Sequence, residues 1–484
     1  MYEIEEIEAL VGARSAEFLE YSDRVWDRPE LRWEEHTAVA AQIELARAAG
    51  FRVTEEVGGI PTAFYAEAGA GGPVIAILGE YDALAGLSQA ADVPRPQPAP
   101  GNESGNGQGC GHNLLGAGGL LAAVSIAELL RTQGLPGRVR YYGCPAEEGD
   151  GGKTFMVARG AFSDVDIALT WHPGITTRVI DNPLLAVFHA RFRFEGRASH
   201  ASISPQLGRS ALDAVELMNV GSNYLREHMP DDARLHYAIT DSGGLSPNVV
   251  QRTAEVYYSV RSPRGRDARE LFERVQRVAD GAALMTDTAV RMTLSGAYSE
   301  VLHNRTLEGR LQQILEHVGG VPFDDADRAL AASFATTFTR EDMESGSRSF
   351  GGTVAVEGPL HEGVIPENPR PPVRHGSTDV GDVSWVTPTA QFYSACWAYG
   401  TPNHSWQAVA QGKSSYAHKG VTHAATVLTA LAIDLFTDGD LRQKVVAEHE
   451  SKLDERPYES PYGPEVVPPP LRAEWTGSNA GGNH

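Results

Sequence analysis

The sequence predicts an α/β fold, a mixed sheet flanked by helices, with a smaller α+β domain inserted into it. Three observations lead to this prediction. Short apolar runs typical of buried strands alternate with helical stretches along most of the chain. Between about residues 184 and 298 the strands instead alternate apolar with polar residues. The 484 residues also exceed what one hydrophobic core usually organises, so two domains are expected.

The composition argues against several classes of partner. The formal net charge of −22 disfavours nucleic acids and anionic membranes, and we find no apolar run long enough to span a membrane. The first thirty residues are rich in Glu and lack a basic segment followed by an apolar run, so we expect no signal peptide. Three cysteines are too few, and odd in number, for a disulfide framework. We therefore expect a cytoplasmic protein.

The first elements follow from apolar spacing. Residues 4–50 read as helices, because apolar side chains recur at helical intervals. The continuous apolar run 74–78 predicts a buried strand, and the acids Glu80 and Asp82 follow it directly. The stretch 88–108 is rich in Pro, Gly, Asn and Gln and is too long for a simple connection in a compact domain. It predicts a loop near the functional site.

Polar side chains follow three further predicted strands, at 138–144, 165–171 and 390–396. These strands lead to Glu147 and Glu148, to His172, and to His404. Ligands of α/β sheets collect beyond the carboxyl ends of the strands, where such side chains would meet. A functional site is therefore expected at this edge of the sheet.

The inserted segment has its own pattern. Half-exposed strands at 190–196 and 254–261 are each followed by a helical stretch, at 210–226 and 267–286. A β-helix-β-β-helix-β order is typical of a small α+β domain with one four-stranded antiparallel sheet. We accordingly divide the chain into 1–184 and 299–456 for the main domain, 185–298 for the insert, and a poorly ordered tail, rich in Pro and Gly, at 457–484.

The strongest chemical signal is a set of metal-type ligands. Cys110 and His112 stand two residues apart, at the start of a helix predicted over 114–130. The complete set is Cys110, His112, Glu148, His172 and His404. Sulfur, imidazole and carboxylate ligands in this mixture suit zinc, manganese or a similar ion. Two ions that share a ligand would use all five, and the adjacent Glu147 is then a candidate base for a water molecule.

Two other interpretations remain. Cys110 at a helix start could act as a nucleophile with His112 or His172 as its base, but that pair would leave the other ligands without a purpose. A non-catalytic protein with a structural metal is the second alternative. Structural zinc sites usually draw ligands from short loops, whereas these ligands come from strand ends spread along the chain.

Short motifs occur in order along about residues 1–450: Gly-Glu-Tyr-Asp-Ala-Leu at 79–84, Cys-Gly-His-Asn at 110–113, Pro-Ala-Glu-Glu-Gly at 145–149, His-Pro at 172–173, His-Ala-Ser at 200–202, Ala-Leu-Asp-Ala at 211–214 and Asn-His-Ser at 403–405. Together they resemble the M20 metallopeptidase and amidohydrolase family. The nearest branch is that of the p-aminobenzoyl-glutamate hydrolase-like amidohydrolases, relatives of the indole-3-acetyl-amino-acid hydrolases. The long loop before Cys110 and the stretch 377–383 fit that branch.

The resemblance implies an aminopeptidase-like catalytic domain with two divalent metal ions. By resemblance, the five residues of the ligand set bind the metals, Glu147 is the general base and acid, and Asp82 orients a ligand. The sequence departs from the commoner M20 pattern at Glu80, where a histidine usually stands. The role of Glu80 is therefore open.

The resemblance also gives the insert a function, as a lid that dimerises the protein. It implies a homodimer in which His200 reaches the active site of the partner subunit and stabilises the oxyanion. Asn248 and Arg261 are implied to bind the substrate. Asn248 stands in a turn that enters a strand and Arg261 ends a strand, so both could lie at a sheet end facing the cleft. A guanidinium matches a carboxylate bidentately, and an anionic substrate needs a positive anchor in a chain of this charge.

These observations lead to one expected function. The chain should be a metal-dependent amidohydrolase that cleaves the amide between an acyl or aroyl group and an amino acid with a free carboxylate. A dipeptidase of the same family and a catalytically silent relative that only binds ligands are the alternatives.

Overall fold

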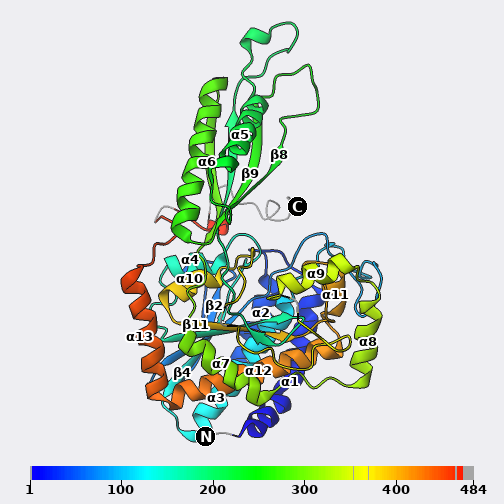
Figure 1. The fold of residues 1–484 in the computed structure, drawn as a ribbon, viewed down its shortest axis with the longest axis vertical. Helices are drawn as coiled ribbons and strands as arrows, with labels where there is room; N and C mark the ends of the chain where they lie inside the picture. The colour runs from blue at the N-terminus through cyan, green and yellow to red at the C-terminus, as the bar shows by residue number, and fades with distance from the viewer. Residues whose placement is uncertain (1–2, 353, 369, 464–465, 472–484) are drawn as a thin grey trace.

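The computed structural model describes residues 3–352, 354–368, 370–463 and 466–471 and contains two sheets (Figure 1). The larger one has seven strands in the order β1-β2-β4-β3-β5-β11-β6. They are β1 Arg52–Glu55, β2 Phe64–Ala70, β3 Val74–Gly79, β4 Gly137–Gly143, β5 Ile167–Gly174, β6 Arg178–Val179 and β11 Thr389–Ala395. Strands β4, β3, β5 and β11 are parallel, and the outer pairs are antiparallel. The predicted mixed sheet is confirmed.

The central strand β3 shows why the sequence forms this sheet. All six of its residues are buried. Ile75 and Ile77 contribute to one hydrophobic core, whereas Ala76 and Leu78 contribute to the other, because successive side chains point to opposite faces. A strand covered on both faces is expected to be a continuous apolar run. The parallel strands then end together at one edge of the sheet.

Helices cover both faces of this sheet (Figure 1). Helices α1, α3 and α12 pack together on one face, and α4 and α10 pack together on the other. The helices outside the insert are α1 Ile4–Asp27, α2 His36–Ala48, α3 His112–Gln133, α4 Gly152–Ala158, α7 Arg305–Val318, α8 Asp325–Ala335, α9 Arg340–Ser349, α10 Val380–Val386, α11 Trp406–Gln411, α12 Ser415–Thr437 and α13 Gly439–Glu455. The helix predicted over 114–130 is α3, which begins earlier, at His112.

Two of these helices, α3 and α12, are long and apolar enough to cross a membrane, although inspection of the sequence found no such run. In the structure 89% and 83% of their apolar windows are buried inside the protein. The two helices pack against each other, and their apolar side chains belong to the core beside the sheet. Their composition is therefore that of core helices.

The insert forms an elongated domain that rises from the main body (Figure 1). Its sheet has the order β10-β7-β9-β8 and is antiparallel. The elements are β7 Ala186–Glu195, α5 Ala211–Leu225, β8 Arg234–Asp241, β9 Thr253–Ser262, α6 Gly265–Thr286 and β10 Ala289–Tyr298. This is the predicted β-helix-β-β-helix-β order. Both helices pack on one face of the sheet, where Phe188 stacks on Phe272 of α6, and the other face is polar.

The tail packs on the protein where it is described, although its composition predicts poor order. Tyr462 is 5% exposed, and its ring stacks on Phe155 at 4.1 Å. Its hydroxyl donates to the carbonyl of Asp150 and accepts from the backbone N–H of Ala297 at the end of β10. Burial of aromatic side chains outweighs the Pro and Gly content there. The rest of the predicted tail, 464–465 and 472–484, lies outside the described residues.

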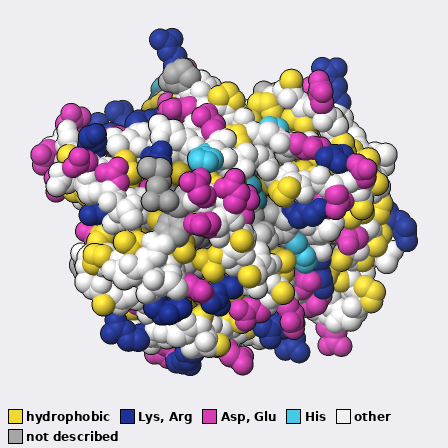
Figure 2. All heavy atoms as spheres, turned by 90° about the horizontal axis from the view of Figure 1, so that it is seen from below, with side chains coloured by type: hydrophobic (Ala, Val, Ile, Leu, Met, Phe, Trp, Pro, Cys, Tyr) yellow, Lys and Arg dark blue, Asp and Glu magenta, His cyan; other side chains and the backbone are white. Residues whose placement is uncertain are grey.

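One face of the protein shows side chains of every kind. Acidic, basic and hydrophobic side chains are interspersed on the face seen from below (Figure 2). All three cysteines, Cys110, Cys144 and Cys396, lie in the described part of the chain and are free.

Candidate metal centre and active site

The predicted metal ligands meet at the carboxyl edge of the larger sheet. Cys110 lies two residues before α3 begins, and His112 is the first residue of that helix. Glu148 follows β4, His172 lies near the end of β5, and His404 follows β11. The described residues form three groups of possible ligands, and within each group the ligand atoms lie within 4.8 Å of one another. The groups are Cys110 with His112 and His172, Cys110 with Glu148 and His404, and Glu80 with His112 and Glu147. Cys110 belongs to the first two groups.

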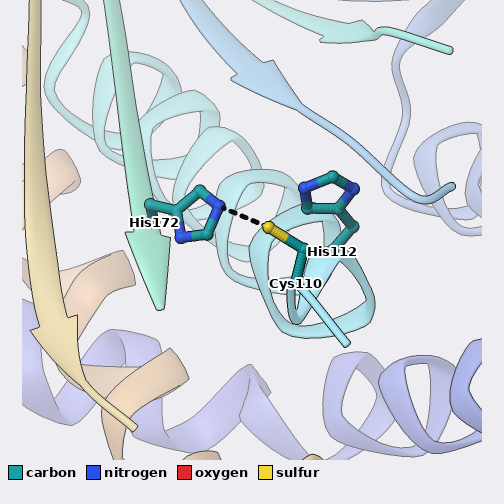
Figure 3. A group of neighbouring side chains, drawn as sticks. All are labelled: Cys110, His112 and His172. Carbon is teal, nitrogen blue, oxygen red and sulfur yellow. Dashed lines mark hydrogen bonds between the residues drawn. The ribbon is translucent and has the colours of Figure 1, made fainter. Parts of the chain in front are cut away.

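Figure 3 shows the first of these groups. The side chains of Cys110 and His172 point toward each other, and Cys110 Sγ lies 3.4 Å from His172 Nε2. The other ring nitrogen of His172 lies 2.8 Å from the carbonyl of Pro173, which fixes the ring orientation. In the second group His404 Nε2 lies 3.3 Å from Glu148 Oε1.

Asp82 connects the two sides of the site. Its Oδ1 lies 2.9 Å from Nδ1 of the fully buried His112. Its Oδ2 accepts a hydrogen bond of 2.8 Å from the backbone N–H of Glu148. The contact at Nδ1 leaves His112 Nε2 directed at the carboxylate of Glu80, at 3.2 Å. One buried carboxylate thus contacts both an imidazole and the turn that carries Glu147 and Glu148.

The backbone is strained beside the two acids. Ala146 has a φ of 55° and His404 a φ of 53°, in the left-handed region that L-residues rarely adopt. The buried carboxylate of Glu35 accepts a 2.8 Å hydrogen bond from the N–H of Ala146 and so supports this conformation. Sequence reasoning missed Glu35, which reads as an ordinary surface acid before a helix.

The ligands alter one another's pKa values. Burial and Glu148 would raise the pKa of Cys110, but His112, His172 and His404 lower it to about 6. Burial would raise the pKa of Glu148, but chiefly His404 lowers it to about 2. Glu148 in turn raises the pKa of His404 to about 11. The site therefore favours the thiolate and the carboxylate, which are the forms that bind metals, whereas His404 would have to lose its proton to bind one.

Glu147 behaves differently from its neighbour. Burial raises its pKa well above the ordinary value, and the carboxylates of Glu80, Glu148 and Asp379 add to the effect. The pKa values of two adjacent acids in one turn are thus shifted in opposite directions. Such a difference typically separates a proton-transfer group from an ionised ligand.

A buried ion cluster that no sequence motif predicts adjoins the site. The ammonium of Lys153, at the start of α4, is fully buried. It lies 2.6 Å from Glu80 Oε1 and 2.6 Å from Asp379 Oδ1. Burial would raise the pKa of Glu80, but Lys153 outweighs it and holds the pKa below its ordinary value. A lysine that begins a helix usually reads as a solvated charge.

The donor spacing fits metal ions. Two donors that bind one tetrahedral zinc ion at about 2.0–2.3 Å lie roughly 3.3–3.8 Å apart. The three donor pairs described above are separated by 3.4, 3.3 and 3.2 Å. Among the residues that the structure describes, three buried atoms of the site have no hydrogen-bond partner: Glu80 Oε2, His112 Nε2 and Glu148 Oε1. Buried polar atoms of this kind require an explanation, and bound cations supply one.

Comparison with known proteins identifies the family. The model of the peptidase dimerisation domain of M20 proteins matches residues 186–285. The chain is 45% identical to one of the subunits of p-aminobenzoyl-glutamate hydrolase from Escherichia coli (strain K12), over 96% of this chain and 98% of that protein. The chain belongs to the M20 metallopeptidase and amidohydrolase family, in its p-aminobenzoyl-glutamate hydrolase-like branch. It is accordingly a hydrolase of amide bonds.

Two further proteins are similar to the chain, one in sequence and one in fold. The chain is 28% identical to the Xaa-Arg dipeptidase from Mus musculus, over 90% of this chain and 89% of that protein. Its fold is similar to that of the aminobenzoyl-glutamate utilization protein from Klebsiella pneumoniae, with a TM-score of 0.58 and 17% identity over 89% of this chain and 98% of that chain.

The M20 lid does not bring its predicted site residues together. His200 and Asn248 are neighbours at the far end of the sheet, where Ala201 N donates to the carbonyl of Asn248. Arg261 instead pairs with Val187 in register at the end near the main body. About eight strand residues, or roughly 25 Å, separate the two ends. The expectation that Asn248 and Arg261 share one sheet end is therefore wrong, because the register places them at opposite ends.

Arg261 lies where the lid meets the main domain. Its Nη1 donates to the carbonyl of His375 at 3.2 Å and to Ser377 Oγ at 3.3 Å. The side chain is half-buried, and among the residues that the structure describes its other guanidinium N–H groups have no hydrogen-bond partner, so they remain for a ligand or solvent. His200 is exposed at the far end, and its Nδ1 accepts from the backbone N–H groups of Ser202 and Ile203.

Proposed function

We propose that this chain is a metal-dependent amidohydrolase that cleaves the amide between an acyl or aroyl group and an amino acid with a free carboxylate, with p-aminobenzoyl-glutamate as the first candidate. The proposal rests on two ligand groups that share Cys110 and on the neighbouring Glu147, whose pKa is raised. The substrate name comes from the relative that is 45% identical.

The ligand sets support two divalent ions, either zinc or manganese. Cys110, His112 and His172 would hold one ion, and Cys110, Glu148 and His404 the other. Bound there, the ions would lower the pKa of a water molecule and polarise the scissile carbonyl. Four further ligands around Cys110 favour this role over that of a nucleophile, which needs only one base and one orienting group.

The protein's own groups would move the proton. Glu147 takes the proton of the attacking water and returns it to the leaving amine, and its raised pKa favours holding the proton between these steps. Asp82 fixes the tautomer and direction of His112 through Nδ1 and holds the backbone of Glu148 in place. Its role is to position these groups and not to react.

We propose that the lid, residues 185–298, completes the site from a partner subunit in a homodimer. His200 and Asn248 are too far from Arg261, at the base of the same lid, to act on a common substrate within one chain. A second copy could supply them, with His200 stabilising the oxyanion. The outer side of the lid supports such pairing: β8 is a free sheet edge, and Leu217, Val220 and Tyr224 form an exposed apolar stripe on α5.

Arg261 is the proposed anchor for the substrate carboxylate. The contacts to His375 and Ser377 hold its guanidinium at the junction of the two domains. A planar guanidinium can bind a carboxylate through two parallel hydrogen bonds, which a lysine cannot reproduce.

The free cysteines also support a reducing cytoplasm as the place of action.

A substrate panel tests the proposal. Purified protein is assayed with p-aminobenzoyl-glutamate, with acetyl, benzoyl and indoleacetyl conjugates of Asp and Glu, and with dipeptides that end in Arg. We expect turnover of p-aminobenzoyl-glutamate that a chelator abolishes and zinc or manganese restores. Preference for the dipeptides would favour the dipeptidase alternative, and metal binding without any turnover would favour a silent relative.

A further inference from the structure

Lys153 is the starting point of a further inference. Its ammonium is enclosed, with no solvent exposure, between the carboxylates of Glu80 and Asp379. Asp379 also accepts from the backbone N–H of Lys153 at 2.8 Å, so Asp379 and Lys153 hold each other at two points. One ammonium between two carboxylates leaves a negative charge uncompensated, and buried uncompensated charge is costly. A second positive charge, either on the imidazole of His112 beside Glu80 or on a bound ion, would balance the cluster.

The geometry of Glu80 indicates where such an ion belongs. Lys153 occupies only Oε1, whereas Oε2 is buried and lies 3.2 Å from His112 Nε2. Within the described part of the chain neither of these two atoms has a hydrogen-bond partner, so the imidazole N–H is not aligned with the carboxylate oxygen. Two atoms that lie side by side at this distance, both unsatisfied, are arranged as two donors to one ion.

We propose that Glu80 is a further, one-oxygen metal ligand on the His112 side of the centre, and that Lys153, anchored by Asp379, is the positioning residue that holds it there. This inference rests on the proposed metal-dependent function. Because Lys153 occupies Oε1, Glu80 can offer the metal only Oε2. Its carboxylate then adds an oxygen donor beside the sulfur of Cys110 and the nitrogens of His112 and His172.

A purely structural ion pair is the competing explanation. If Glu80 serves only to neutralise Lys153, removal of its charge should affect stability and leave metal binding unchanged. The chain offers a matched control in Glu308 of α7, which is also buried and is also ion-paired, with His303 and Arg305. Glu308 belongs to none of the three ligand groups.

The test uses full-length protein and Co²⁺ as the probe. Cobalt stoichiometry and affinity are measured by titration, and the visible ligand-field spectrum of the cobalt-loaded protein reports the donor set. We expect Glu80→Gln to weaken one of two Co²⁺ sites by more than about 100-fold, beyond what outer-shell changes usually cost, and to alter the spectrum. Lys153→Met should weaken the same site less strongly, and Glu308→Gln should match the wild type.

Wild-type affinity and spectrum in Glu80→Gln would overturn the inference and leave the proposed function standing. Failure of the wild type to bind Co²⁺ would instead defeat the proposed function itself. If Glu80→Gln does not fold, Glu80→Asp replaces it, since this variant keeps the charge but is too short to reach both Lys153 and the ion. Two Co²⁺ sites of wild-type affinity in Glu80→Asp would equally refute the assignment.

Discussion

Replacing Glu147 with glutamine should separate proton transfer from metal binding. Glutamine keeps the shape of the side chain but cannot accept and return a proton. Glu147 lies within 4.8 Å of ligand atoms of Glu80 and His112, whereas Glu148 lies with Cys110 and His404. We expect Glu147→Gln to keep its metal and lose about 10²- to 10⁴-fold in kcat, which corresponds to about 3–5 kcal/mol of barrier.

The structure also gives the sign of a stability effect in the metal-free protein. The carboxylate oxygens of Glu147 and Glu80 lie no more than 4.8 Å apart and repel by at least about 3 kcal/mol at an effective dielectric constant of about 20. His112 and Lys153 offset part of this, so Glu147→Gln should gain about 1 kcal/mol. Because burial and neighbouring acids raise the pKa of Glu147, the gain should be present at pH 7 and vanish below the ordinary pKa of a glutamate.

Three measurements on Glu147→Gln decide the matter: kcat with p-aminobenzoyl-glutamate, metal content by elemental analysis, and chemical denaturation of the metal-free protein at pH 7 and pH 4. Glu148→Gln is the matched control and should lose metal. Wild-type turnover in Glu147→Gln would refute the proposed proton transfer. Loss of metal in Glu147→Gln, with metal retained in Glu148→Gln, would show that the two roles are exchanged.

Other consequences can be checked in the same way. Chelation and Cys110→Ala should each abolish activity with loss of metal, and full activity in a protein shown to be metal-free would exclude the mechanism. Mixing inactive His200→Ala and Glu147→Gln proteins under subunit exchange should restore activity, whereas proven heterodimers without recovery would count against sharing. Arg261→Lys should raise KM for N-acyl-glutamates but not for amidated analogues, and equal KM values would place the carboxylate elsewhere. Glu448→Gln should destabilise the protein by about 2 kcal/mol at pH 7, because Glu448 accepts from two backbone N–H groups at the start of α7. Burial would raise the pKa of Glu448, but Lys452 and these hydrogen bonds lower it to about 2, so the difference should shrink as the pH falls from 4.5 toward 2.

The strand ends made the convergence of the candidate metal ligands predictable. Strand β3 is a continuous apolar run, and β4, β5 and β11 are short segments with many apolar, aromatic or small residues, so their carboxyl ends can be located in the sequence. Glu148 lies shortly after β4, and His172 lies near the end of β5. Parallel strands converge at one edge, so residues far apart in sequence meet without further information. The same reasoning gave the order of the lid elements.

The supporting residues were not predictable, because their partners come from distant segments. Lys153 and Asp379 are separated by more than two hundred residues, and neither sequence neighbourhood signals a buried ion pair. The predicted placement of two lid residues was wrong for another reason. Asn248 precedes β9 and Arg261 lies near its end, so the length of this one strand places them at opposite ends of the sheet, as the predicted strand bounds already imply.

The position of β11 has a consequence for how the chain folds during synthesis. This strand fills the place between β5 and β6, yet it is made more than two hundred residues after β5. At about 5–20 residues per second, β5 would wait roughly 10–40 s with one edge unpaired. The lid, which lies wholly within that interval, can fold first. An unpaired apolar edge strand is a site of aggregation, so a chain that stops before β11 should be insoluble even though most of the candidate site residues have been made.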